Sequence, residues 1–250
     1  YLSMKEAVGQ IIHENVFVPL SFFYDMAPVH AASIISEYGK LLVFGGTGGV
    51  GKSSILILTA LMKELNYGFY SDDFLIVNSD GFALPNYAYP KIYAYNVFLY
   101  PQLKSYLFKQ RSWLNKLHWS IHKRRGLSKV RRRVAPDNLW NVFYFNKASI
   151  SAYFILNRGN FRKIAVVPLE LSAAASMTLN IAKAEYWSFI NHIYWHIYNR
   201  ELMARNPLIT LDEVTRKWSD IYRHSFSNAN ISVVNIPLSL SHQSFISIDR

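Results

Sequence analysis

The chain has 250 residues, 51% hydrophobic and 17% charged, a composition typical of a globular protein and not of a disordered one. It contains no cysteine, which excludes disulfides, thiolate nucleophiles and cysteine-ligated metals and fits a reducing, cytoplasmic compartment. There is no apolar run of about 18 residues and no basic-then-apolar leader, so neither a transmembrane helix nor a signal peptide is expected.

The first half of the chain alternates between strand-like and helix-like patterns. Residues 30–44 predict one or two strands around a turn at 37–40, and residues 51–65 predict a helix that stops near Asn66. A short strand is then expected to reach Asp72, followed by a hairpin that turns at 78–81.

The second half continues this alternation. Apolar residues at helical spacing predict an amphipathic helix over about 102–124, with a basic outer face. Two strands joined at 158–160, a helix from about 172 past 187, a helix capped by Thr210 and Glu213 and a final apolar run are expected to follow. Together these elements predict one α/β domain over 1–250, with a mainly parallel sheet flanked by helices.

The stretch GGTGGVGKSS, residues 45–54, matches the phosphate-loop pattern G-x-x-x-x-G-K-[ST] at every position. Glycines let backbone N–H groups turn around phosphate oxygens, and the following helix points its positive end at the same oxygens. Lys52 is expected to reach the β- and γ-phosphates of a nucleotide, and the Ser53 hydroxyl to bind Mg²⁺. The predicted nucleotide-binding residues are Gly46, Thr47, Gly48, Gly49, Val50, Gly51, Lys52, Ser53 and Ser54.

Two adjacent aspartates, Asp72 and Asp73, follow Lys52 by about twenty residues at the end of a predicted strand. A carboxylate in this position can hold the metal that bridges the terminal phosphates. A second carboxylate beside an acceptor hydroxyl can take its proton as the oxygen attacks. The pair therefore indicates a division of labour, although solvated acids at a strand end are the plainer alternative.

Residues 81–136 contain twelve Lys and Arg residues and no Asp or Glu, with the highest density at 122–133. Such a field attracts anionic partners, although a solvated basic face that promotes solubility is an alternative. Arg131, Arg132 and Arg133 are candidate contacts to the γ-phosphate or to an anionic acceptor. Trp113 and Trp119 could stack on nucleic-acid bases, but they also suit the apolar stripe of a helix.

The stretch from VHAASIISEYGKLLVFGGTGGVGKSS to YGFYSDDFLIV resembles the HPr kinase/phosphorylase-like P-loop kinases, which share a fold with ATP-dependent phosphoenolpyruvate carboxykinase. The shared pattern is a histidine before a hairpin, then a strand, the glycine loop and its helix, and a strand ending in Asp-Asp. His30 stands at the histidine position. The resemblance covers about residues 28–190 and leaves 1–27 and 191–250 as peripheral, unassigned segments.

The resemblance implies a kinase that uses ATP and Mg²⁺ to phosphorylate a hydroxyl, with His30 near the active site and one aspartate as the base. That base is Asp72 or Asp73; we favour Asp72 for the metal and Asp73 for the acceptor. The family's glycine-rich segment with a metal-associated glutamate is replaced by YPKIYAYN, where Lys91 is the nearest counterpart. The partner-recognition signature is also missing, so phosphorolysis and HPr as acceptor are not expected.

The expected function is a Mg-ATP-dependent kinase acting on a hydroxyl acceptor that is anionic, with serine of a peptide or protein favoured. Two alternatives stay open. One is an ATPase that binds RNA or an acidic partner through the basic segment, and the other is a sugar or nucleoside kinase. Neither the acceptor nor the oligomeric state can be read from the sequence.

Overall fold

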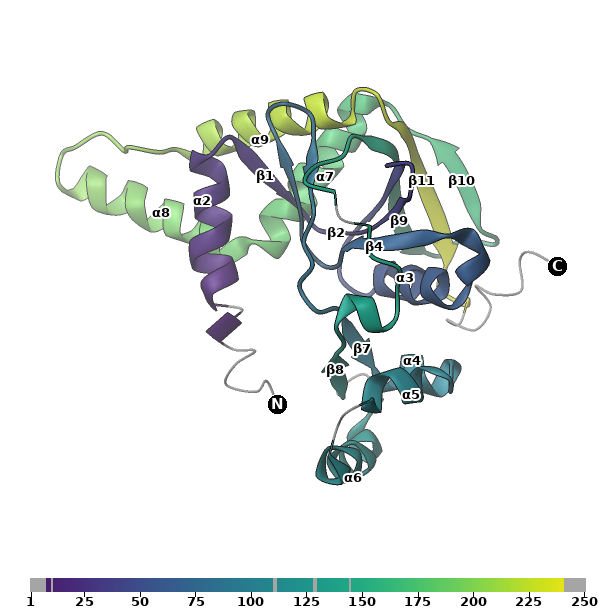
Figure 1. The fold of residues 1–250 in the computed structure, drawn as a ribbon. Coiled ribbons are helices and arrows are strands. Elements are labelled where there is room, and N and C mark those ends of the chain that lie inside the picture. The colour runs from purple at the N-terminus through teal and green to yellow at the C-terminus, as the bar shows by residue number, and fades with distance from the viewer. Residues whose placement is uncertain (1–7, 10, 110–111, 128–129, 144, 241–250) are drawn as a thin grey trace.

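The computed structural model describes residues 8–9, 11–109, 112–127, 130–143 and 145–240. Within these residues the main sheet has six strands in the order β10-β11-β9-β3-β2-β4, flanked by helices (Figure 1). Its strands are β2 (Ala31–Ser36), β3 (Leu41–Gly45), β4 (Tyr67–Ser71), β9 (Ile150–Gly159), β10 (Ala165–Pro168) and β11 (Asn230–Pro237). The α/β class predicted from the sequence is therefore correct.

The sheet is mixed, so the prediction of a mainly parallel sheet is wrong. β9 runs parallel to β3 and to β11, but β2 is antiparallel to both β3 and β4, and β10 is antiparallel to β11. The turn at 37–40 is too short for a crossover connection, so β2 and β3 can form only an antiparallel hairpin. β2 then lies between β3 and β4, which the α3 (Lys52–Leu61) crossover joins.

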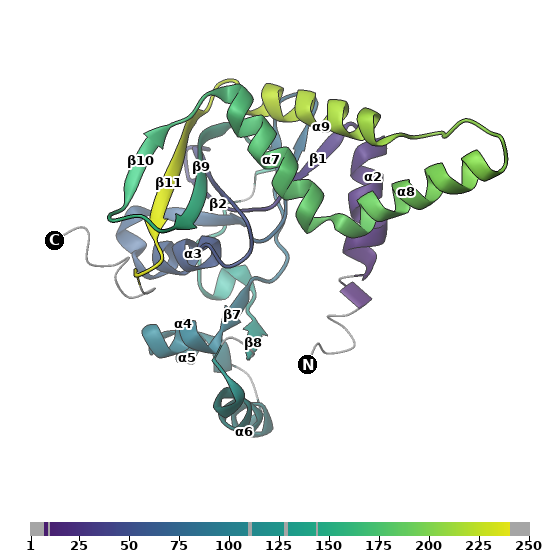
Figure 2. The ribbon, with the colours of Figure 1, turned by 180° about the vertical axis from the view of Figure 1, so that it is seen from behind.

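Helices cover both faces of the main sheet. On one face, α7 (Leu171–Glu185) and α9 (Leu211–Phe226) bury apolar side chains against β2, β3 and β9. Figure 2 looks onto the face that α7 crosses. On the other face, α3 buries Leu56, Ile57 and Ala60 against Ala32 and Ile34 of β2. The strand ends before and after α3 are thereby held between two packed layers.

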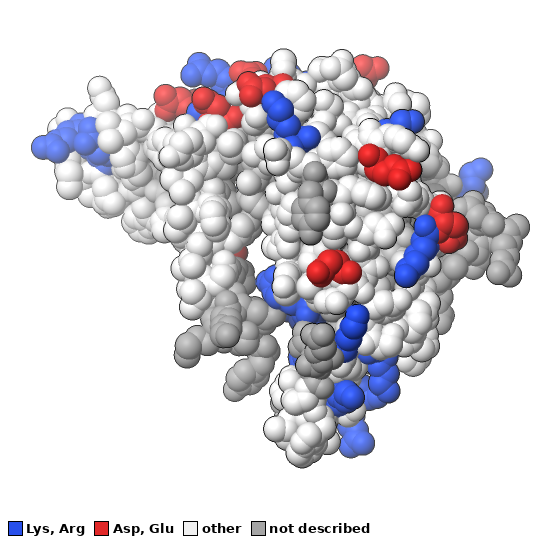
Figure 3. All heavy atoms as spheres, in the orientation of Figure 1, with Lys and Arg blue, Asp and Glu red and all other residues white. Residues whose placement is uncertain are grey.

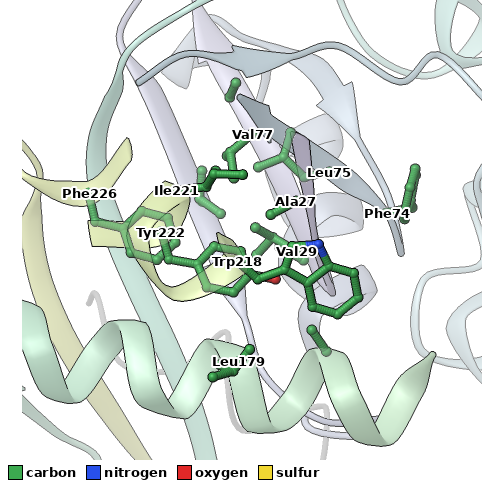
Figure 4. Close-up of a cluster of buried hydrophobic side chains, with 14 of the residues drawn as sticks. Ala27, Val29, Phe74, Leu75, Val77, Leu179, Trp218, Ile221, Tyr222 and Phe226 are labelled. Atoms are coloured by element: carbon green, nitrogen blue, oxygen red, sulfur yellow. The ribbon is translucent and has the colours of Figure 1, made fainter. Parts of the chain in front are cut away.

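A second antiparallel sheet is formed by β1 (Met26–Val29), β5 (Leu75–Asn78) and β6 (Ala83–Leu84). The pairing of β5 with β6 confirms the predicted hairpin. Figure 4 shows Trp218 and Tyr222 of α9 packed over the side chains of this sheet. Both are fully buried, so α9 is part of the core.

The segment 191–250 is expected at the periphery, but its described part, 191–240, supplies a core helix and β11, which lies between β9 and β10. A single sequence does not show this, because the β9–β11 pairing joins segments about 80 residues apart. The capping box of Thr210 and Glu213 at the start of α9 is confirmed.

Two predicted helices are each divided in the structure. The helix expected over 102–124 consists of α5 (Leu103–Phe108) and α6 (Trp113–His122), followed by a turn of 3-10 helix at Lys123–Arg125. The helix expected from 172 past 187 ends at Glu185, and α8 (Trp187–Leu202) begins after Tyr186, whose backbone leaves the helical conformation. Helical periodicity continues across both breaks, so the sequence pattern alone does not show them.

Residues 91–133 form a lobe that projects from the sheets, and we call it the basic lobe (Figures 1 and 2). It contains β7 (Lys91–Tyr93) paired with β8 (Arg131–Arg133), α4 (Ala94–Leu99), α5 and α6. Figure 3 shows Lys and Arg atoms gathered on this lobe, whereas Asp and Glu atoms lie mainly over the rest of the visible face. In the described part of the chain, no helix is long and apolar enough to cross a membrane.

The N-terminal segment packs beside α8. It consists of a π-helical turn at His13–Phe17 and α2 (Val18–Phe23). The Asn15 side chain accepts from the Ser188 hydroxyl and lies 2.8 Å from Nε2 of His192, which fixes the segment to α8.

Candidate functional site

The glycine loop, residues 46–51, connects the end of β3 to the start of α3. Gly46 has φ 144°, and a Cβ there would meet the Leu156 carbonyl oxygen at 2.8 Å, so a side chain is excluded. Gly51 precedes α3 with φ 114°. The first turn of α3 contains no acidic residue, so no carboxylate within that turn offsets the positive end of the helix.

Lys52 folds back over the glycine loop. Its Nζ donates to the carbonyl oxygens of Gly46 at 2.9 Å and Thr47 at 2.8 Å. Burial lowers the pKa of Lys52, while the carboxylates of Asp73, Glu185 and Asp72 oppose that shift. The ammonium group is therefore held at the loop in a site that favours added negative charge.

Ser53 and Asp72 meet across the space between α3 and the end of β4. The Ser53 hydroxyl donates to Oδ1 of Asp72 at 3.1 Å. Burial, together with the charge of Asp73, raises the pKa of Asp72 to about 7. A buried carboxylate with this shift gains from a nearby cation, which would favour its ionised form.

Asp73 differs from Asp72 in conformation and in partner. Its φ of 63° is left-handed, and the Phe74 N–H donates to the Asp72 carbonyl across it at 2.8 Å, so the chain turns sharply there. Lys91 Nζ donates to Oδ2 of Asp73 at 3.0 Å. Burial alone would raise the pKa of Asp73, but the ammonium group of Lys91 and, to a smaller extent, that of Lys52 hold it below its usual value. Asp73 is thus the ionised, more exposed carboxylate of the pair.

His30 and Glu185 complete the site on the side of α7. Nε2 of His30 lies 3.7 Å from Oε1 of Glu185, and the same oxygen accepts from the Gly48 N–H at 3.1 Å. Burial and the neighbouring Lys52 lower the pKa of His30, and Glu185 and Asp73 oppose this. His30 is therefore a neutral, largely buried ring at neutral pH.

Sequence reasoning did not find Glu185. It lies 137 residues from Gly48, and in the sequence nothing distinguishes it from an ordinary glutamate near the end of a helix. The fold brings it to the glycine loop because α7 crosses the sheet and ends there. Its carboxylate occupies a backbone N–H group of the kind that a phosphate oxygen would use.

The predicted acceptor residues divide into two groups. Lys91 lies against Asp73, next to the glycine loop. The arginine side chains contact residues of the basic lobe or next to it: Arg131 donates to the Tyr93 hydroxyl at 3.5 Å, Arg132 lies 2.8 Å from Nδ1 of His118, and Arg133 donates to the Tyr89 carbonyl at 2.9 Å. The lobe therefore adjoins the site through β7, whose first residue is Lys91.

The oxygen atoms of Ser53 and Asp72 fit a magnesium ion. Among the described residues no group of three His, Asp or Glu side chains could hold a metal by itself. Mg²⁺ differs from metals that need such a group, since it is usually held by one or two protein oxygens and by substrate phosphates. The hydroxyl and the buried carboxylate beside the loop meet that requirement.

An apolar wall lies behind the aspartates. The ring of His13 packs edge-on against Phe74 at a centroid distance of 4.2 Å and contacts Tyr186. Within the described residues, neither Nε2 of His13 nor the Tyr186 hydroxyl has a hydrogen-bond partner, and both atoms are buried. Burial lowers the pKa of His13, so this wall contributes an uncharged ring.

The structure brings most of the predicted site residues together around the glycine loop. These are His30, Gly46, Thr47, Gly48, Gly49, Val50, Gly51, Lys52, Ser53, Ser54, Asp72, Asp73 and Lys91, joined by Glu185. Comparison of the chain with protein-family models and with curated proteins found no match. What the site does therefore has to be inferred from its own geometry.

Proposed function

We propose that the protein is a Mg-ATP-dependent kinase that transfers the γ-phosphoryl group to a hydroxyl, with serine of a peptide or protein as the favoured acceptor. The observation that carries the proposal is the meeting of the glycine loop, Lys52, Ser53 and the aspartate pair in one site. Phosphoryl transfer needs little covalent help and depends on positioning and on stabilising charge, which these groups offer.

The nucleotide phosphates would bind at the glycine loop. Loop N–H groups and the start of α3 would donate to phosphate oxygens, and Lys52 would exchange its bonds to the Gly46 and Thr47 carbonyls for bonds to phosphate. Glu185 would have to release the Gly48 N–H. Ser53 and Asp72 would hold Mg²⁺, which supplies positive charge between the terminal phosphates when bound.

Asp73 is the proposed base. As the acceptor oxygen bonds to the γ-phosphorus, the bond from that phosphorus to the β–γ bridging oxygen breaks, and ADP leaves with the electron pair. The hydroxyl proton passes to the Asp73 carboxylate, which Lys91 keeps ionised. Asp73 suits this role better than Asp72, because Asp72 is buried and engaged with Ser53.

A labelling experiment tests the proposal. The protein is incubated with ATP labelled in the γ-phosphate and with an extract of the source cells, and the labelled products are identified. We expect a product labelled on a hydroxyl with the wild type, but not with Lys52→Ala or Asp73→Asn. The exposed lysine variant Lys63→Ala serves as the matched control and should retain transfer.

Two outcomes would contradict the proposal. One is release of free phosphate at a rate that no added hydroxyl acceptor changes, which indicates an ATPase. The other is equal labelling by the wild type and by Lys52→Ala, which would remove the glycine loop from the reaction.

A further inference from the structure

The most unusual surface of the molecule is on α6, at the far end of the basic lobe. Trp113, Leu114, Leu117 and Ile121 are between 48% and 69% exposed, although helical spacing predicts that the leucines and Ile121 face a core. The residue of α6 that is buried is Trp119, which is 5% exposed and packs against Phe108. The helix is therefore amphipathic, but it turns its apolar side to solvent.

The four exposed residues form one stripe, which we call the α6 stripe. At 100° per residue they fall within about a third of the helix circumference, opposite Trp119. In a globular protein such an apolar helix face normally packs against another element of the core. Within the described part of the lobe the stripe has no such cover, since each of its side chains is about half exposed or more.

Cations border the α6 stripe. On one flank, Lys104 and Lys109 of the α5 segment and Lys116 of α6 line a hollow of about 460 Å³, with Phe108 and Trp119 among its lining residues. On the other flank, Arg132 contacts His118 and lies over the Trp119 ring. No Asp or Glu occurs anywhere in residues 81–136, so no carboxylate in this stretch would repel an anionic surface.

We propose that the basic lobe binds an anionic lipid bilayer, with the α6 stripe inserted at the level of the headgroups and the lysines bound to lipid phosphates and carboxylates. A short helix with Trp and Leu on one side and basic residues beside them is the composition of helices that lie in a membrane interface. In this proposal the lobe binds to the surface of the bilayer and does not cross it. The proposal does not depend on the proposed kinase function.

Two features favour a bilayer over a protein or an RNA partner. In both views α6 is at the extremity of the lobe, so a flat surface can reach this helix (Figures 1 and 2). The bordering cations are mostly lysines, which protein–protein interfaces contain less often than the rest of a protein surface does. For RNA, the buried Trp119 cannot stack on bases, and Leu117 and Ile121 offer no hydrogen bonds.

The test is flotation of the purified protein with vesicles. One set contains phosphatidylcholine alone, and the other contains equal parts of phosphatidylcholine and phosphatidylserine. We expect binding to the second set only, weakened by added salt. Lys104→Gln with Lys116→Gln should weaken it about 30-fold, because each lysine near an anionic surface contributes a factor of about five. The matched control, Arg162→Gln with Lys163→Gln, removes two exposed cations outside the lobe and should bind as the wild type does.

A second pair of variants tests insertion. Leu117→Ser with Ile121→Ser should weaken binding at least about tenfold, because half-exposed apolar side chains would lose their burial in lipid. Leu202→Ser with Leu208→Ser changes two apolar residues elsewhere that are even more exposed, and it should have no effect. Lipids brominated in the acyl chain should quench tryptophan fluorescence in the wild type and less in Trp113→Phe.

Three results would overturn the proposal. The first is equal binding to the two vesicle types or to neither. The second is equal losses in the lobe variants and their controls. The third is an absence of vesicle binding together with tight binding of an oligouridylate, or of a polyglutamate peptide, that the Lys104 and Lys116 changes abolish. That result would assign the lobe to a nucleic acid or an acidic protein.

Discussion

The glycine-loop site and the basic lobe both gather charge, but they do so under opposite conditions. In the site, Lys52 and Asp72 are buried and each charged group has a partner within hydrogen-bonding distance. In the lobe, the lysines beside the α6 stripe are exposed and no carboxylate occurs in the same stretch of sequence. Buried charges interact strongly and over short distances, whereas exposed charges act weakly, collectively and in a salt-dependent way.

This difference predicts the size and the kind of effect that substitutions have. A change in the site should affect a single step by a large factor and depend little on ionic strength. A change in the lobe should affect the capture of a partner by a small factor that salt reduces.

Removal of the loop cation should have the largest effect. Lys52→Ala is expected to lower turnover by about 10²–10³-fold or more, because a preorganised positive group at the phosphates is lost. The measurement is acceptor-dependent ADP release. If Lys52→Ala retains wild-type turnover, phosphoryl transfer does not take place at this site. The expectation that substitutions in the site have larger effects than those in the lobe would then be wrong.

The two aspartates should separate binding from transfer. Asp73→Asn is expected to lower transfer by about 10²-fold while ATP affinity stays within a small factor, because the amide cannot accept the proton. Single-turnover labelling and ATP titration of the same protein measure both quantities. Full transfer by Asp73→Asn would contradict its role as the base and would leave Asp72 as the candidate for that role.

Glu185 gives a prediction of opposite sign. Glu185→Gln should bind ATP about two- to fivefold more tightly, since the carboxylate at the Gly48 N–H competes with phosphate oxygens. Titration at several salt concentrations measures the gain. Glu201→Gln, which removes an exposed carboxylate on α8, is the control. Weaker ATP binding by Glu185→Gln would mean that this residue supports the bound nucleotide.

The arginines of β8 test the lobe. Arg131→Gln with Arg133→Gln should raise the KM for an anionic acceptor about fivefold at low salt and leave the KM for ATP unchanged, because Arg131 donates to Tyr93 of the lobe and Arg133 donates to Tyr89 beside it. Added salt should remove the difference. An unchanged acceptor KM would show that this part of the lobe is a solvated face.

The last prediction concerns how the stability of the fold depends on pH. The pKa of His13 is lowered by burial, so the folded protein binds fewer protons here than the unfolded chain. The free energy of unfolding therefore keeps its full contribution from His13 above pH 6.5. It falls as the pH drops below 6.5, because the unfolded chain then gains a proton at His13. His13→Phe should flatten this decline by at most about 1.4 kcal/mol per pH unit, measured by urea unfolding. The exposed His224→Gln is the control, and an unchanged slope in His13→Phe would contradict the shift.

The sequence predicts the site better than it predicts the fold around it. His30, the loop, and the aspartates lie within 44 residues along three consecutive strands, so local pattern is enough to place them near one another. Glu185 and the interior strand β11 come from distant segments, and their positions depend on contacts and pairing that no local pattern specifies. The exposure of Leu117 and Ile121 is missed for another reason: periodicity identifies an apolar stripe but not what covers it.

The proposed function requires that the glycine loop and Lys52 hold the terminal phosphates of ATP opposite Ser53 and Asp72. Isothermal titration of ATP into the purified protein, with and without Mg²⁺, measures this binding. We expect Mg²⁺-dependent binding that Lys52→Ala abolishes, and we expect Asp72→Asn to lose the dependence on Mg²⁺. No binding of ATP under either condition, or equal binding by the wild type and Lys52→Ala, would contradict the proposed function.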